Sequence, residues 1–225
     1  MNGITFESTS RLVKAGDITL HLNEVGDGPP LVLLHGSGPG ATSWSNFKQN
    51  LPALSQHFRV LAVDQPGYGK SDKPPFSRED SIFQVTSRAL VGLFDELGIE
   101  QAHILGNSLG GANALRFAID HPERVSRMVL MGPGGAAVNI FSPPLSEGFK
   151  LLHTFFGADN PTRDQLEAFI RIMVFDQDLV TEELIDERFA AAVEPDQLDG
   201  ARRVQKSMQN LPEDDQLWRY LHKIR

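Results

Sequence analysis

The sequence predicts an α/β fold, in which a doubly wound, mostly parallel sheet carries a separate layer of helices. Two observations predict this class. Short apolar runs alternate with helical patterns as far as Met131, and from Gly132 onward only helical periodicity remains. Ligands of such sheets bind outside the carboxyl ends of the strands. The turns that follow the apolar runs are therefore where a functional site is expected.

Four short apolar runs are typical of buried parallel strands, namely residues 31–34, 60–63, 103–105 and 128–131. Ahead of them, polar and apolar residues alternate over 11–14 and 18–24, on either side of Gly16-Asp17. This alternation predicts an antiparallel hairpin at the edge of the sheet.

Two helices are expected between these strands. Apolar residues recur on one face over 82–97, and Gly98 stops that pattern. The second helix covers 109–120 and ends at His121-Pro122.

A helical lid is expected after two breaks, Gly132-Pro133-Gly134-Gly135 and Ser142-Pro143-Pro144. Capping residues and first-turn prolines mark its helix starts: Thr162 with Gln165, Thr181 with Glu182 and Glu183, Pro195, and Pro212. The predicted organisation is a core over 1–132, a lid over 133–215 and a return toward the core over 216–225, without the C-terminal strands of the core.

Composition narrows the function. The 225 residues are 40% hydrophobic and 22% charged, which suits one globular domain. The formal charge of -8 argues against nucleic acid and anionic membrane surfaces as partners. The absence of cysteine excludes disulfides, thiolate catalysis and zinc–sulfur sites. With neither a leader pattern nor an apolar run of membrane-spanning length, we expect a cytoplasmic protein.

The pentapeptide Gly106-Asn107-Ser108-Leu109-Gly110 lies where an expected strand meets an expected helix. This context favours a nucleophile elbow, in which flanking glycines permit a sharp turn that exposes the serine hydroxyl. The helix N-terminus favours negative charge that develops there. A packing turn with an incidental serine is the alternative, and the strand-to-helix context disfavours it.

The loop His35-Gly36-Ser37-Gly38-Pro39-Gly40 follows the first buried strand and can face this elbow. We expect it to present backbone N–H groups to an oxyanion, with Ser37 and Leu109 as the donors. A dinucleotide-type phosphate loop is the alternative, but the glycine spacing does not match it. His35 is expected to form structural hydrogen bonds behind the loop.

Asp64 and several lid arginines are candidate functional residues. Asp64 stands in a Pro/Gly turn, where a single carboxylate usually caps the turn. Arg171, Arg202 and Arg203 are expected to be solvated on their helices, and Arg188 is the exception.

The sequence resembles the meta-cleavage-product hydrolases, α/β-hydrolases that split 2-hydroxy-6-oxo-dienoates formed by extradiol ring opening. The resemblance runs through nearly all of the chain. It rests on 35–41, on Trp44-Ser45-Asn46, and on 64–69, 106–111 and 131–135. The segment from Asn139 to Gly148, followed by Phe175-Asp176-Gln177, is most similar to the steroid-degrading branch, and the biphenyl-degrading branch is close behind.

The resemblance implies that Ser108 is the nucleophile and that Ser37, Gly38 and Leu109 hold the oxyanion. It further implies that Asn46, Asn107 and Arg188 bind the carboxylate and 2-oxo end, with Asp178 lining the same pocket. A guanidinium suits this task because it can grip a carboxylate through two hydrogen bonds. Two departures are Ser37, where glycine is usual, and Asp178, where a neutral polar residue is common.

The implied reaction hydrolyses a carbon–carbon bond by attack on the C6 ketone, giving a 2-hydroxydienoate and a carboxylic acid. It needs no metal or organic cofactor, and members of the family often form homo-oligomers. We expect a serine ester rather than directly activated water, because the elbow exposes Ser108.

A serine nucleophile needs a base, and in this fold the order is Ser, then Asp, then His. The histidines after Ser108 are His121, His153 and His222, and none follows a strand-end Asp. We therefore expect a C-terminally truncated chain that is inactive as it stands.

Three other readings stay open: a rewired triad that uses His153 or His222, a non-catalytic ligand-binding protein on a hydrolase scaffold, and a carboxylesterase. The carboxylesterase would retain Ser108 but would have no special need of Arg188.

Overall fold

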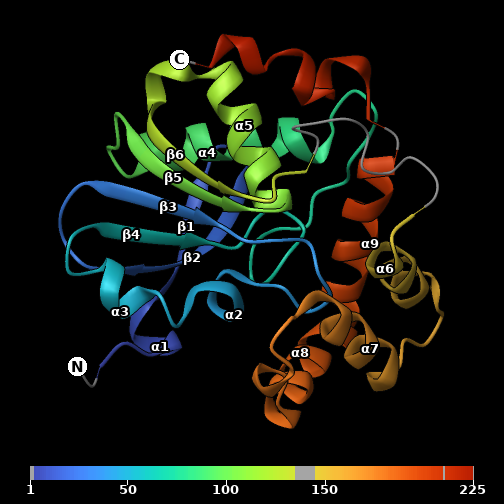
Figure 1. The fold of residues 1–225 in the computed structure, drawn as a ribbon. Coiled ribbons are helices and arrows are strands. Elements are labelled where there is room, and N and C mark those ends of the chain that lie inside the picture. The colour runs from blue at the N-terminus through green and yellow to red at the C-terminus, as the bar shows by residue number, and fades with distance from the viewer. Residues whose placement is uncertain (1–2, 135–144, 210, 225) are drawn as a thin grey trace.

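The structure is a computed structural model that describes residues 3–134, 145–209 and 211–224. Its sheet has the strand order β1-β2-β4-β3-β5-β6 (Figure 1). The strands are β1 (Ser10–Ala15), β2 (Ile18–Val25), β3 (Pro30–Leu34), β4 (Arg59–Val63), β5 (Ala102–Asn107) and β6 (Val125–Met131). β3 pairs in parallel with β4 and β5, and β5 with β6, whereas β1 and β2 are antiparallel. The predicted edge hairpin and mostly parallel sheet are confirmed.

Helices cover both faces of the sheet because successive strand residues point to opposite sides. Val32 and Leu34 pack in one core cluster with residues of α4 (Ile82–Glu96) and α5 (Leu109–Asp120). Leu31 and Leu33 pack in another with Phe47 and Leu51. The latter two belong to α2 (Ser43–Phe47) and α3 (Leu51–Leu54), while α1 (Phe6–Thr9) precedes β1.

The prediction that residues 128–131 form a buried strand was wrong in part. β6 is an edge strand, and Val129 and Met131 are 59% and 44% exposed. Met128 and Leu130 pack into the core on the face that α5 covers. The alternate residues face the other side, where nothing in the described ranges buries them.

The lid consists of helices between residues 147 and 209: α6 (Glu147–Gly157), α7 (Arg163–Met173), α8 (Glu182–Val193) and α9 (Pro195–Gln209), with the short η2 (Gln177–Leu179) between α7 and α8. Thr162 and Gln165 form the predicted capping box, and Thr181 caps α8. Pro212 directly precedes η3 (Glu213–Asp215), a 3-10 helix of one turn, and does not begin an α-helix. The segment from Asn139 to Pro143, which carries part of the resemblance to the steroid-degrading branch, lies outside the described residues.

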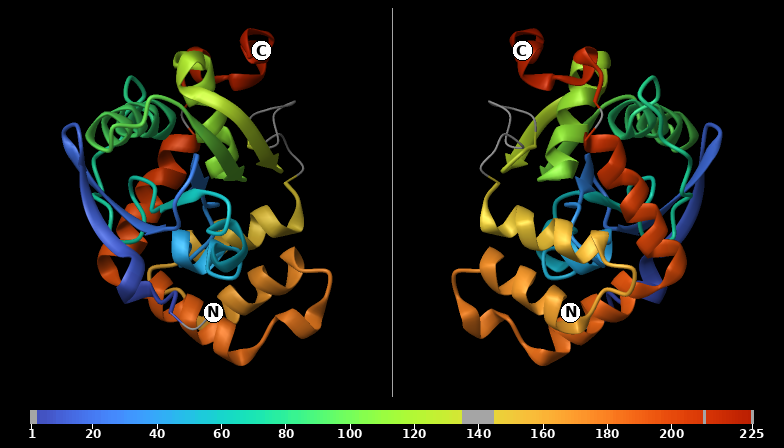
Figure 2. Two further views of the ribbon diagram at one scale, coloured as in Figure 1. Left: turned by 90° about the vertical axis from the view of Figure 1, so that its left-hand side faces the viewer. Right: turned by 90° about the vertical axis from the view of Figure 1, so that its right-hand side faces the viewer.

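Polar contacts hold the lid against the core at several places, two of which lie at α9 and at η3. Lys73 forms an ion pair with Asp196 of α9 at 2.9 Å. Buried Asp215 accepts hydrogen bonds from Ser81 and, at 2.9 Å, from Arg116 of α5. After η3, the turns η4 (Leu217–Arg219) and η5 (Leu221–Lys223) lie beside α5 (Figure 2). These contacts hold the lid over the carboxyl ends of the parallel strands. The predicted domain boundaries stay a prediction.

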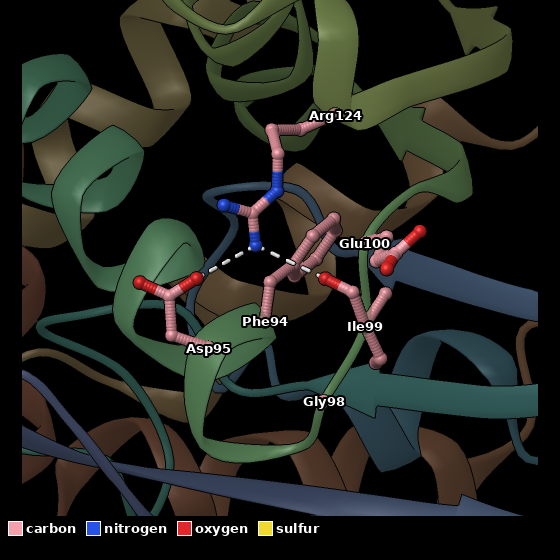
Figure 3. A pocket seen from close by; sticks show the side chains of 6 residues that line it. All are labelled: Phe94, Asp95, Gly98, Ile99, Glu100 and Arg124. Atoms are coloured by element: carbon pink, nitrogen blue, oxygen red, sulfur yellow. Dashed lines mark hydrogen bonds and ion pairs between the residues drawn. The ribbon is translucent and has the colours of Figure 1, made fainter.

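A shallow depression of about 470 Å³ lies beside the C-terminus of α4, and the residues that line it make structural contacts with one another (Figure 3). Arg124 of η1 (Pro122–Arg124) donates to Asp95 Oδ1 at 2.8 Å and to the Ile99 carbonyl oxygen at 3.0 Å. Its guanidinium lies over the Phe94 ring. These contacts tie the turn at Gly98 to η1, which precedes β6, and they pair the charge of Arg124 with Asp95.

Candidate active site

Ser108 occupies a strained turn between β5 and α5. Its φ of 51° is the only positive φ of a non-glycine residue in the described ranges. Such strain in a residue with a Cβ marks a functional turn when the surrounding structure enforces it. A Cβ at Gly106 would lie 2.5 Å from the Gly110 carbonyl oxygen, and one at Gly110 would lie 2.1 Å from that of Leu34. Only glycines therefore permit this close packing, and the strand-turn-helix context predicted for the elbow is present.

A cavity of about 500 Å³ opens beside Ser108, between the ends of the core strands and the lid. Its core side is lined by Gly36, Ser37, Gly38, Ala41, Asn46, Asn107 and Ser108. Its lid side is mostly apolar and is lined by Ser146, Gly148, Phe149, Leu152, Phe169, Ile170, Met173, Val174, Leu184 and Arg188. The cavity is thus polar where it meets the strand ends and apolar toward α6 and α7.

The loop after β3 lies against the elbow. A Cβ at Gly36 would be 3.5 Å from Ser108 Cβ, so the two backbones approach closely. Neither the Ser37 N–H nor the Leu109 N–H has an acceptor within the described parts of the chain. Leu109 is buried, and its side chain packs in a core cluster. Two unused donors beside a serine are what oxyanion binding requires, and their role stays a prediction.

Asn46, Asn107 and Arg188 meet at the polar end of the cavity, as the resemblance implied. Asn46 of α2 accepts from the Gly36 N–H at 3.4 Å, and the Asn107 side chain has no hydrogen bond in the described ranges. Arg188 of α8 donates through Nε and Nη2 to the Pro39 carbonyl oxygen at 3.0 and 2.6 Å. No carboxylate within the described residues forms an ion pair with it, so its charge remains available to an anion.

Burial lowers the pKa of Arg188 to about 10, against the opposing effect of the Glu187 carboxylate. The guanidinium is still protonated at neutral pH. A desolvated cation without a carboxylate partner attracts an anionic ligand strongly, because little water screens its field.

Asp178 is a correction to the expected site. It lies in η2, is exposed, and does not line the cavity. Its backbone N–H donates to Asp176 Oδ1 in a local turn. The Asp178 side chain is exposed to solvent because η2, which connects α7 to α8, lies away from the strand ends.

The comparisons identify the family. A family model described as the alpha/beta hydrolase fold matches residues 29–174. A 2-hydroxy-6-oxo-6-phenylhexa-2,4-dienoate hydrolase of Comamonas testosteroni is 42% identical over 197 residues, which cover 85% of this chain and 68% of that protein. The chain belongs to the meta-cleavage-product hydrolases of the α/β-hydrolase fold. It spans about two thirds of the length of that relative.

Solved structures of this hydrolase family are also similar. The 2-hydroxy-6-oxo-6-phenylhexa-2,4-dienoate hydrolase of Rhodococcus sp. strain RHA1 aligns with a TM-score of 0.79 at 31% identity, covering 92% of this chain and 75% of that one. A meta-cleavage product hydrolase from Pseudomonas fluorescens IP01 aligns with a TM-score of 0.73 at 33% identity, covering 94% and 72%. The closeness to a steroid-degrading branch stays a prediction.

In this family member, His35 is fully buried and forms the structural hydrogen bonds expected of it. Its Nδ1 lies 2.7 Å from the Gly36 carbonyl oxygen, and its Nε2 accepts from the Gln65 N–H at 3.1 Å. Burial lowers the pKa of His35. A neutral ring with both nitrogens engaged cannot serve Ser108 as a base.

Asp64 caps its turn, as predicted, and also joins three segments. It accepts from the Lys70 N–H in the turn, from His21 Nδ1 on β2, and from the N–H and hydroxyl of Ser43 on α2. Burial alone would raise the pKa of Asp64, but hydrogen bonds from His21 and Ser43 hold it below its usual range. It is a buried structural carboxylate.

None of the histidines after Ser108 reaches the cavity. His121 lies 3.8 Å from a Glu123 oxygen, His153 is in α6, and His222 is exposed in η5. The rewired triad therefore finds no support in the described residues. Those residues also contain no group of three or more His, Asp or Glu side chains placed to hold a metal ion. No helix in the same ranges is long and apolar enough to cross a membrane.

Two groups of residues at this site were not predicted from the sequence. Gln65 and Asn113, both fully buried, form hydrogen bonds behind the loop, and the only sequence signal was a pair of amides near glycine-rich turns. The apolar lid wall was missed as well. Its residues follow the helical periodicity of α6 and α7, which indicates a buried face but not what that face covers.

Proposed function

We propose that this protein hydrolyses the carbon–carbon bond between C5 and C6 of a 2-hydroxy-6-oxohexa-2,4-dienoate, giving a 2-hydroxydienoate and a carboxylic acid. The observation that carries the proposal is Arg188, a desolvated guanidinium without a carboxylate partner in the described ranges, in the same cavity as Ser108. The substrates named for the similar hydrolases of Comamonas testosteroni and Rhodococcus support the same substrate class.

The polar end of the cavity suits the carboxylate and the neighbouring 2-oxo group. Arg188 uses Nε and Nη2 on Pro39, which leaves Nη1 for the ligand, and Asn107 adds an amide donor. Charge-assisted hydrogen bonds of this kind are about twice as strong as neutral ones. The carboxylate end would thereby fix the position of C6 relative to Ser108.

The chemistry proceeds in two stages. A proton first moves from the 2-hydroxyl to C5, so that the dienol becomes a 2,6-diketone. Ser108 Oγ then attacks C6, its proton passes to a base, and the developing oxyanion accepts hydrogen bonds from Ser37 N–H and Leu109 N–H. The C5–C6 bond breaks as its electron pair delocalises toward the 2-oxo group, and the resulting dienolate takes up the proton held by the base to give the 2-hydroxydienoate. Water hydrolyses the serine ester that remains.

The apolar lid wall suits the substituent at C6. Phe149, Phe169 and Met173 face the cavity and offer no charged partner for a second carboxylate. An aryl or alkyl substituent buries apolar area there at about 25 cal/mol per Å². We therefore place the substituent against α6 and α7.

Binding and turnover of 2-hydroxy-6-oxo-6-phenylhexa-2,4-dienoate test the proposal. The visible absorbance of the dienolate reports both, and Ser108→Ala separates them because it should bind the ligand without consuming it. Arg188→Ala should weaken binding at least tenfold, corresponding to about 1.4 kcal/mol or more. Arg203→Ala, which removes an exposed side chain of α9, is the matched control and should bind normally.

The alternatives predict different results. A carboxylesterase would hydrolyse a simple aryl ester equally well with and without Arg188. A non-catalytic binding protein would bind the dienoate with an affinity that depends on Arg188, but replacing Ser108 would change nothing. Absence of dienoate binding would refute the proposal.

A further inference from the structure

His35 is held in one tautomer by partners whose roles are fixed. The Gln65 backbone N–H can only donate, so His35 Nε2 must carry a lone pair. The Gly36 carbonyl oxygen can only accept, so the proton must be on Nδ1, 2.7 Å away. In the imidazolium, the proton on Nε2 would face the Gln65 N–H. In the other neutral tautomer that conflict would remain, and the lone pair on Nδ1 would also face the Gly36 carbonyl oxygen.

Two buried amides hold this arrangement in place. Gln65 Nε2 donates to the His35 carbonyl oxygen at 2.6 Å, which leaves its Oε1 to accept from Asn113 Nδ2, also at 2.6 Å. The His35 carbonyl oxygen accepts a second hydrogen bond, from the Gly110 N–H at 3.0 Å. Because Gly110 and Asn113 belong to the helix that begins after Ser108, the network connects the loop to the elbow.

The Gly36 carbonyl and the Ser37 N–H belong to one planar, trans peptide unit and point in opposite directions. A hydrogen bond accepted by the carbonyl therefore fixes the direction of the N–H and polarises it. We propose that Gln65 and Asn113 are positioning residues that act through the Nδ1–H tautomer of His35 to aim and polarise the Ser37 N–H as an oxyanion donor. The donor role rests on the proposed function, whereas the tautomer does not.

The surroundings of His35 keep it neutral. Burial lowers its pKa most, Asp64 opposes this, and Arg188 lowers it further. The Tyr68 ring packs edge-on against the imidazole with centroids 5.1 Å apart, and burial raises the pKa of the Tyr68 hydroxyl, so it carries no charge. The balance of these groups leaves the tautomer intact at pH values where a free imidazole, with a pKa of about 6.5, begins to protonate.

Nitrogen NMR of the wild-type chain tests the tautomer directly. The expected spectrum shows His35 with a protonated Nδ1 and an unprotonated Nε2, unchanged between pH about 8 and pH about 6. A proton on Nε2, or an imidazolium within that range, would overturn the proposal. This measurement needs neither substrate nor turnover.

Substitutions test the connection to Ser37. His35→Leu removes the donor to Gly36, and His35→Asn restores an amide donor near the Nδ1 position. The Ser37 amide proton resonance should move upfield in His35→Leu and return toward the wild-type position in His35→Asn. Gln65→Met should move it in the same direction, while Gln205→Met, which replaces a buried glutamine outside the network, should not.

Covalent modification of Ser108 by a fluorophosphonate provides the functional measurement. Ser108 Oγ attacks phosphorus, fluoride leaves, and the hydroxyl proton passes to solvent, with charge developing on the phosphoryl oxygen. Loss of one oxyanion donor costs about 10²–10³ in rate, so a misaligned donor should slow modification about tenfold or more in His35→Leu and Gln65→Met. Equal rates in all variants would overturn the proposal, even if dienoate hydrolysis had already failed. If His35→Leu and Gln65→Met slow the modification as expected but the protein does not hydrolyse the dienoate, only the proposed function is refuted.

Discussion

The backbone of Gly40 lies so close to that of Arg188 that a Cβ at position 40 would be 2.2 Å from the Arg188 carbonyl oxygen. With the hydrogen bonds from the Arg188 side chain to Pro39, this contact joins the loop after β3 to the lid. Arg188, which we propose binds the substrate carboxylate, and Ser37, which we propose donates to the oxyanion, thus lie on two segments that are in direct contact.

Gly40→Ala should therefore separate the loop from α8. Gly40 has a φ of 64°, which alanine adopts at a cost, and the methyl group also meets the Arg188 backbone. We expect the free energy of unfolding to fall by about 2–4 kcal/mol. Gly16→Ala is the matched control, because Gly16 has the same φ and nothing within 4 Å of its added Cβ. Denaturant unfolding of both variants measures the difference, and equal losses would mean that the contact contributes nothing.

Asp64→Asn should destabilise the fold in a pH-dependent way. The carboxylate accepts hydrogen bonds from several donors, and the asparagine would place an NH₂ group against one or more of them. We expect the free energy of unfolding to fall by about 2–4 kcal/mol. The pKa of Asp64 is lowered in the folded chain, so its stabilising effect is complete above the unfolded value of about 3.9 and is lost as pH falls through the lower folded value. The gap in unfolding free energy between wild type and variant should be constant above pH about 5 and shrink below pH about 4. Exposed Asp17→Asn should show no comparable gap at any pH.

Phe169→Ala should change the preference for the substituent at C6. Phe169 lines the cavity, and its ring is 3.4 Å from a Cβ built at Gly38. Loss of the ring should lower kcat/KM for a C6-phenyl dienoate by about tenfold relative to a C6-methyl one, since apolar pocket contacts contribute about 1–3 kcal/mol. Phe175→Ala is the control, because Phe175 is fully exposed on the lid. An unchanged ratio would place the substituent elsewhere.

The 225-residue chain should bind the dienoate but turn it over slowly. None of its histidines lines the cavity in the described ranges, and a positioned general base contributes about 10²–10⁴ in rate. Stopped-flow absorbance should show rapid binding followed by slow decay of the dienolate signal. Fast turnover that disappears in His153→Gln or His222→Gln would instead identify the base that we have not placed.

The sequence alone determined the hairpin, the parallel strands, the two core helices and the elbow, because these follow from hydrophobic periodicity and from glycines at fixed spacing. Resemblance to a family, rather than spacing, singled out Asn46, Asn107 and Arg188, which line one cavity in the structure; their role in binding the carboxylate stays a prediction. The sequence did not determine the exposure of β6, because an apolar strand has the same sequence pattern at the edge of a sheet as at its centre.

Only the tertiary structure decided which residues meet across distant segments. The contact of Gly40 with Arg188, the network from Asn113 through Gln65 to His35, and the exposed position of Asp178 depend on how the lid and the strand ends pack. Local patterns fix which side of an element faces inward, whereas the partner on the other side is set by the three-dimensional packing of elements far apart in the chain.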